Sequence, residues 1–225
     1  MSAFGGFPKG TFTFLRGIAK NNNKDWFEKN RDKYDEFYVE AAKEFVVAAG
    51  TALSKVAPVS FEPRVNGSLF RINRDVRFSK DKTPYKTNLM LRFWEGADRK
   101  TARSGFYLRM DAKRVGVGVG AYGFDKAGLA RYRKAVAHPK KGGALVKAAA
   151  KMTRAGYELQ GSHYKKVPKG FDVDGKAAEL ILHNGLWLGS DEKLPASIGS
   201  KSFVSFCVTR WKKMLPIHRW LTDDM

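Results

Sequence analysis

The sequence predicts a single α+β domain in which a mainly antiparallel sheet is packed by N-terminal and C-terminal helices. Helical periodicity dominates both ends of the chain, whereas the middle holds short segments suited to hairpin-linked strands. The hydrophobic fraction of 43% and the absence of any repeat of fixed period are typical of one globular core. We therefore expect one domain over residues 1–225, with a helical opening (9–57), a sheet and loop region (64–122), and basic helices with a C-terminal helical region (125–222).

The opening region is expected to hold two helices. Apolar residues recur at three- and four-residue steps from Lys9 to Lys20, and a run of three asparagines then ends the first helix. The same periodicity continues from Lys24 or Asp25 to about Lys55, which predicts one long second helix. Pro58 and Pro63 close this region.

The middle of the chain is expected to form strands. Two short extended segments are predicted over 68–73 and 88–94, and a hairpin over 105–111 and 115–122. Three alternating glycines in the last segment leave one strand face without side chains, so that another backbone, an aromatic ring or a ligand can approach closely. Packing of a helix against this face is the interpretation we favour.

The C-terminal region alternates helices with one strand. Asp125 is suited to cap a helix that runs through Ala137 and stops at Pro139. Four further elements are expected after it: a basic helix from about Gly143 to Ala155, a strand near Glu158 to Lys166, a short helix at about Lys176 to Asn184, and a closing helix from about Ser197 that Pro216 kinks or restarts.

Charge is the most informative bulk property of the chain. The sequence has 42 Lys and Arg against 22 Asp and Glu, a net charge of +20, of which residues 1–60 contribute only +2. A field of this sign attracts polyanions such as nucleic acid and raises encounter rates with phosphorylated ligands. The alternative is that the charge serves solubility alone.

The single cysteine and the lengths of the apolar runs indicate in which cellular compartment the protein is expected. The single cysteine, Cys207, lies in an apolar stretch, so an intrachain disulfide is impossible and a buried thiol in a reducing compartment is expected. The first residues lack the pattern of a secretory signal, and no stretch approaches the roughly 20 apolar residues of a membrane span. We therefore expect a cytoplasmic protein without a membrane partner.

The chemically richest stretch is the charged loop, which we define as residues 71–86. It contains six cations and two aspartates. Arginine suits bidentate recognition of phosphate, lysine supplies a mobile point charge, and Tyr85 could stack or donate its hydroxyl. The predicted ligand-binding residues are Arg71, Arg74, Arg77, Ser79, Lys80, Lys82, Tyr85 and Lys86.

The two aspartates leave three hypotheses open. Asp75 and Asp81 would orient the cations of a domain that binds a phosphorylated or nucleic-acid ligand, which is the leading hypothesis. Alternatively, they are the catalytic residues of a phosphoester-acting hydrolase or transferase, in which the cations stabilise developing charge. In the third hypothesis they form an internal ion-pair network within a structural or interaction module.

Several signals of specific chemistry are missing from the sequence. There is no GxxxxGK[ST] phosphate loop and no GxSxG nucleophile motif. The four histidines do not stand at metal-ligand spacing with cysteine or one another, so no metal site is predicted and each is interpreted as a surface or structural residue. Whether the chain is an enzyme, which cofactor it uses and its oligomeric state are left undecided.

The charged loop also carries a resemblance. The run FRINRDVRFSKDKTPYKT resembles the signature of a family of uncharacterised, mostly bacterial proteins catalogued as a conserved domain of unknown function. FPKGTFTFLRGIAKNNNKDWFEKNRDKYDEF, GFYLRMDAKRVGVGVGAYGFD and VPKGFDVD resemble the family's opening helices, central hairpin and later loop. The resemblance implies no established activity, ligand or catalytic residue. His-Pro is common after the later loop in this family, whereas Gly175-Lys176 occupy that place here, which argues against a histidine-dependent role there.

Overall fold

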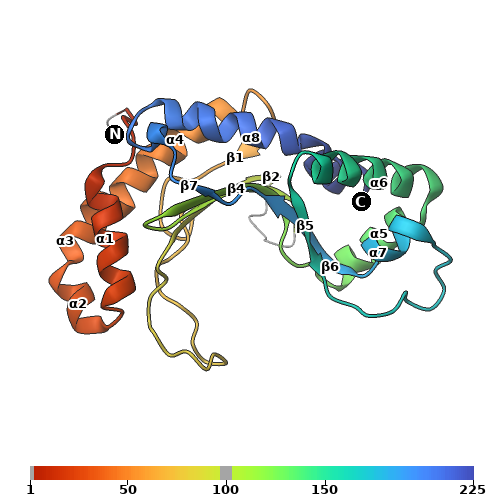
Figure 1. Cartoon of the computed structure of the whole chain (residues 1–225), viewed down its shortest axis with the longest axis horizontal. Helices are drawn as coiled ribbons and strands as arrows, with labels where there is room; N and C mark the ends of the chain where they lie inside the picture. Colours follow the sequence, from red (N-terminus) through yellow and green to blue (C-terminus); the bar gives the residue numbers. More distant parts are fainter. Residues whose placement is uncertain (1–2, 97–102) are drawn as a thin grey trace. The chain divides into compact units, whose positions relative to one another are not determined.

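The computed structural model, which describes residues 3–96 and 103–225, confirms the α+β fold (Figure 1). The helices are α1 (Lys9–Lys20), α2 (Lys24–Lys29), α3 (Arg31–Tyr34), a π-helical segment (Asp35–Glu40), α4 (Ala41–Leu53), α5 (Lys126–Ala137), α6 (Pro139–Arg154), α7 (Gly175–Leu180), a 3₁₀ turn (Ala196–Gly199), α8 (Ser202–Arg219) and a terminal π-helical segment (Trp220–Asp224). The strands are β1 (Val59–Ser60), β2 (Leu89–Glu95), β3 (Gly105–Met110), β4 (Arg114–Ala121), β5 (Glu158–Ser162), β6 (His183–Gly189) and β7 (Glu192–Lys193). None of the helices in the described part of the chain is long and apolar enough to cross a membrane.

The strands form one sheet in the order β1-β2-β3-β4-β6-β5, and β7 pairs with β4 outside this path. The start of β4 is antiparallel to β7, with Arg114 opposite Lys193. The end of β4 is antiparallel to β6, where Ala121 lies opposite Leu186. β5 is also antiparallel to β6. The mainly antiparallel sheet expected from the sequence is therefore confirmed.

Two compact units divide the chain. The first comprises Met1–Phe93, Tyr107–Val117 and Asp191–Thr209. The second comprises Trp94–Phe106, Gly118–Ser190 and Arg210–Met225. The charged loop belongs wholly to the first unit.

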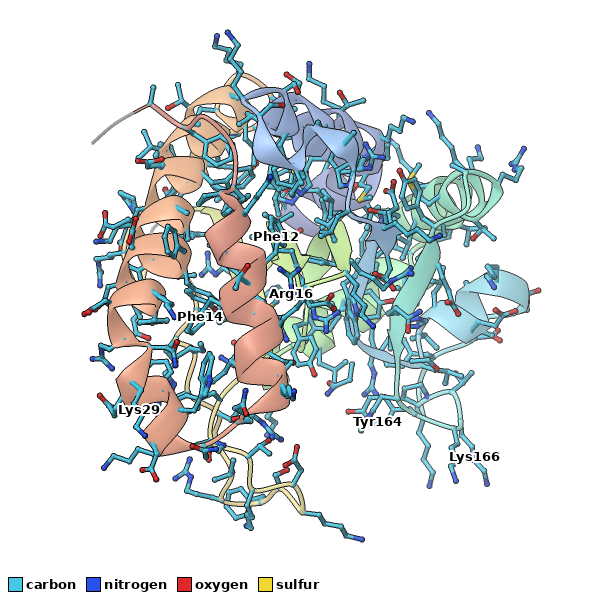
Figure 2. The ribbon with its side chains drawn as sticks, turned by 60° about the vertical axis from the view of Figure 1, so that its left-hand side comes forward. Phe12, Phe14, Arg16, Lys29, Tyr164 and Lys166 are labelled. Atoms are coloured by element: carbon cyan, nitrogen blue, oxygen red, sulfur yellow. The ribbon has the colours of Figure 1, made fainter. Side chains whose placement is uncertain are left out.

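Aromatic side chains dominate the core of the first unit. Phe14 of α1 lies beside the helices that follow it (Figure 2), where its ring contacts those of Trp26, Phe27, Tyr34 and Tyr38. A second cluster joins the N-terminal segment to α4 and α8 through Phe4, Phe7, Phe45 and Phe203. Cys207, on the same helix as Phe203, is a buried free thiol, as its apolar surroundings in the sequence predict.

The core of the second unit is built around Tyr132 of α5. Its ring stacks on Phe124 at 4.7 Å between centroids and meets Trp220 edge-on at 5.8 Å. Its hydroxyl donates to the carbonyl of Leu180 at 2.7 Å, which satisfies the one polar atom that burial would otherwise leave unpaired. Asp125 accepts a hydrogen bond from the backbone N–H of Gly128, so the predicted cap of this helix is present.

Four predicted helices differ from those observed. The basic helix expected from about Gly143 begins earlier, at Pro139. The long second helix is interrupted at Asn30, which leaves the helical region of φ and ψ and donates from its side chain to the carbonyl of Trp26. The short helix expected up to Asn184 ends at Leu180, because strand β6 begins at His183. Pro216 lies inside α8 and does not restart it. The buried residues on either side of this proline pack into the core, which offsets the lost backbone hydrogen bond.

The predicted strand over 68–73 was wrong, because this segment makes only isolated bridges at Leu69 and Asn73. The predicted hairpin, by contrast, is present as β3 and β4. At Gly120 the close neighbour is a strand rather than a helix. This residue has φ +135°, and a Cβ on it would lie 2.2 Å from the carbonyl oxygen of Leu186 in β6.

Candidate functional site

The charged loop leaves the sheet as two arms of chain that run side by side (Figure 1). The backbone N–H of Arg74 donates to Pro84 at 2.8 Å, and the N–H of Lys86 donates to Ile72 at 2.8 Å. These bonds close the base of the loop and leave residues 75–83 as its tip. Only one pair of residues, Asn73 and Tyr85, forms a β-bridge between the arms, so the arms do not form regular strands.

Neutral groups attach the loop to the helical region of the first unit. The side-chain amide of Asn22 donates to the Tyr85 carbonyl at 2.8 Å and accepts from the Tyr85 N–H at 3.0 Å. The Tyr85 ring stacks on Phe27 of α2, with 4.3 Å between centroids. Tyr85 is only 6% exposed, so its side chain is part of the core. We therefore leave it out of the proposed ligand-binding set.

Arg74 is held within the loop. Its Nη1 donates to Asp81 Oδ2 at 2.5 Å, and also to the carbonyl and hydroxyl oxygens of Thr83. Its Nη2 lies 3.4 Å from Ser79 Oγ. Asp81 in turn accepts from the Thr83 N–H at 2.9 Å and the Thr83 hydroxyl at 2.8 Å. This cluster joins the two arms and orders the tip.

Arg77 is paired with Asp75 in bidentate geometry. Its Nε lies 3.0 Å from Oδ1 and its Nη2 lies 2.7 Å from Oδ2. The Arg77 side chain is nevertheless 76% exposed, so this pair is solvated and contributes little to stability. Both aspartates of the loop thus pair with arginines of the same loop, as the third sequence hypothesis expects.

The remaining four cations fall into two kinds. Lys82 Nζ donates to the Val76 carbonyl at 2.9 Å, and Lys86 Nζ donates to the Arg71 carbonyl at 2.7 Å. Arg71 and Lys80 are exposed, and the side chain of neither makes a hydrogen bond or ion pair within the described part of the chain. Since carbonyl groups carry no net charge, the loop keeps a net charge of +4 around its two satisfied carboxylates.

Phe78 is the residue of this site that the sequence analysis did not select. Its side chain is 96% exposed at the loop tip, and the Arg77 guanidinium carbon lies 5.8 Å from the centre of its ring. The exposure of this phenylalanine is directly visible in the structure. In the sequence, however, it stands between a polar and a charged residue like many core aromatics, so nothing there separates it from Tyr85.

Hydrogen bonds set the protonation state of the two aspartates. The Thr83 N–H and hydroxyl, together with Arg74, lower the pKa of Asp81 to about 2. The Arg77 side chain lowers the pKa of Asp75 as well. Both groups are therefore carboxylates at neutral pH and weak proton acceptors, which weighs against a general-base role.

We expect the Asp81 carboxyl to titrate with a midpoint near pH 2 in the folded protein, followed by ¹³C NMR of its side-chain carbon. Because the pKa is lowered on folding, the Asp81 contacts stabilise the loop above the ordinary pKa of about 3.8, and this contribution is lost as the pH falls toward 2. Thr83→Val removes the hydroxyl donor and should move the midpoint upward. A wild-type midpoint near 3.8 would show that these contacts do not persist in solution.

The second unit carries its own basic surface. Nine cations and one acidic residue lie between residues 125 and 154, which span α5 and α6. Arg133 lies over the ring of Tyr164 at 4.5 Å, and Tyr164 and Lys166 stand on the segment that follows β5 (Figure 2). The described residues contain no cluster of three His, Cys, Asp or Glu side chains suited to a metal ion.

Comparison with protein families gives one match. A family model described as a conserved hypothetical protein (DUF2461) matches residues 10–220. A search among curated proteins finds no match to the chain.

Proposed function

We propose that this chain, which belongs to the family of conserved hypothetical proteins DUF2461, binds single-stranded nucleic acid through its charged loop. Such binding requires cations that track the phosphate backbone and aromatic rings on which bases stack. The loop offers both kinds of group within residues 71–86.

The observation that carries the proposal is the exposure of Phe78. The Phe78 ring is 96% exposed and stands among the cations of the loop, so a base can reach its face, as binding of a single strand requires. A base stacked on the ring would cover it, and the neighbouring Arg77 guanidinium would lie beside the phosphate of the same nucleotide.

The arrangement of the cations supports an extended ligand. The side chains of Arg71 and Lys80 have no hydrogen bond or ion pair among the described residues, so both are open to phosphates. Arg77 is solvated, so a phosphate can compete for it with Asp75.

A phosphoester-acting enzyme at the same loop remains an alternative hypothesis with less support. It assigns proton transfer to Asp75 or Asp81, whose pKa values are both lowered by hydrogen bonds. A carboxylate with so low a pKa removes a proton poorly at neutral pH.

The double variant Arg71→Gln/Lys80→Gln tests the proposal. Each phosphate contact on a single strand contributes about 0.7 to the slope of log Kobs against log salt concentration, so we expect a slope shallower by about 1.4. The measurement is fluorescence anisotropy of a labelled oligo(dT) over a range of salt concentrations. Because both side chains are exposed, the melting temperature should not change.

The control is Lys55→Gln, which removes an exposed cation of the same unit outside the loop. We expect it to leave the slope within experimental error of the wild type. If the wild-type protein fails to bind oligo(dT) at low salt, or if the double variant keeps the wild-type slope, the proposal is wrong.

A further inference from the structure

Three polar side chains of the second unit form a continuous hydrogen-bonded chain. Ser104 Oγ lies 2.7 Å from His218 Nδ1. His218 Nε2 lies 2.9 Å from Glu95 Oε1. Glu95 ends β2, Ser104 directly precedes β3, and His218 stands near the end of α8. A hydroxyl, an imidazole and a carboxylate thus follow one another in the order that activates a nucleophile.

The contacts of Glu95 determine which imidazole nitrogen carries the proton. Glu95 also accepts hydrogen bonds from Arg219 Nη1, at 3.2 and 3.4 Å, so it acts as an acceptor on this side. The proton shared with His218 therefore lies on Nε2, and Nδ1 presents its lone pair to the Ser104 hydroxyl. Ser104 is then the donor and His218 the base.

The imidazole is held in one orientation. His218 is completely buried and its ring packs on Phe106, with 4.3 Å between centroids. Burial lowers the pKa of His218, so the ring is neutral at pH 7 and able to take up a proton. If it does so, Glu95 faces the new positive charge at hydrogen-bond distance.

Ser104 and Glu95 line a cavity of about 470 Å³, a size that suits a small ligand. His218 lies behind this wall rather than in it, as expected of a base that acts through the serine. Arg131, from the second turn of α5, is also part of the wall and offers N–H donors for a developing oxyanion. Asp125 lines the cavity too, but its carboxylate already accepts from Gly128.

We propose that Ser104 is the nucleophile of a hydrolytic site for small carboxylic esters, with His218 as general base and Glu95 as positioning residue. Ser104 Oγ bonds to the ester carbon while its proton passes to His218 Nδ1. The bond to the leaving alcohol breaks and that oxygen takes the proton from Nδ1. Water then attacks the acyl-serine by the same route, which releases the acid and restores the hydroxyl.

The test uses the full chain and a fluorophosphonate probe, whose phosphorus forms a bond to an activated serine with loss of fluoride. We expect one adduct, located at Ser104 by peptide mass spectrometry. Ser200 and Ser202, which are hydrogen-bonded to each other at 2.7 Å and not to a histidine, are internal controls and should stay unmodified. Absence of the Ser104 adduct from folded protein overturns the proposal.

A second measurement follows hydrolysis of p-nitrophenyl acetate. We expect the wild type to exceed Ser104→Ala by at least about 100-fold, since a positioned base contributes roughly that factor or more. Equal rates would show that Ser104 is only structural. Because Ser104 lies outside the charged loop, Arg71→Gln/Lys80→Gln should keep full labelling, so this proposal and the nucleic-acid proposal succeed or fail separately.

The role of Glu95 is tested by the pH profile of labelling. The imidazole of His218 faces Ser104, Glu95, Arg219 and Asp223. Glu95 raises the pKa of His218, so Glu95→Gln should slow labelling and move the midpoint of the profile to lower pH. An unchanged midpoint and rate would remove Glu95 from the proposal.

Discussion

Phe78→Ala is expected to weaken binding of single-stranded oligonucleotides by roughly 5- to 150-fold, which corresponds to the loss of about 1–3 kcal/mol of base stacking. The melting temperature should not fall, because a ring that is 96% exposed contributes little to folding. Titration of labelled oligo(dT) at fixed salt, together with thermal unfolding of the free protein, measures both effects. The salt slope should be unchanged, since phenylalanine carries no charge.

Tyr122→Ala provides the matched control for this experiment. Among the residues that the structure describes, Tyr122 is the other strongly exposed aromatic residue, at 74%, and it belongs to the second unit beside Trp187. We expect its removal to leave oligonucleotide affinity unchanged. A similar loss of affinity in both variants would mean that the effect is not specific to Phe78. The assignment of base stacking to the loop tip would then be wrong.

Trp211→Ala is expected to lower the free energy of unfolding by about 3–5 kcal/mol, because it removes a large, fully buried side chain from the core. The Trp211 ring meets Phe106 edge-on, with 6.2 Å between centroids, and Phe106 in turn supports His218. Urea denaturation followed by circular dichroism measures the change.

Trp26→Ala is the control for Trp211→Ala. Trp26 of α2 is partly exposed and packs over Gly17. We therefore expect Trp26→Ala to lower the free energy of unfolding clearly less than Trp211→Ala does. If Trp211→Ala cost no more than Trp26→Ala, the packing described for the second unit would not hold in solution.

Sequence reasoning succeeded where local rules decide the structure. The helix over Lys9–Lys20 was predicted with its observed bounds, because apolar spacing and the asparagine run that follows are both local signals. The cap at Asp125 and the hairpin of β3 and β4 were predicted for the same reason. Strand β6 was missed, since His183–Gly189 mixes glycine, asparagine and apolar residues without clear alternation.

The functional residues were predicted less completely. The sequence pointed to the charged loop and left an internal ion-pair network as one of three hypotheses for its aspartates, and the Arg74–Asp81 and Arg77–Asp75 pairs are present. It could not rank Phe78 above Tyr85, because exposure depends on which ring finds a partner. Tyr85 found Phe27 and Asn22, the latter 63 residues earlier in the chain.

By itself the sequence determined the α+β class and the excess of positive charge, of which residues 71–86 carry +4, since these follow from composition and short-range spacing. The tertiary structure alone decided which cations remain open to a ligand and which side chains meet at a distance. Ser104 and His218 are 114 positions apart, yet their hydrogen bond is 2.7 Å long. Such pairs form only when strands and helices from distant segments pack together, so no local sequence pattern predicts them.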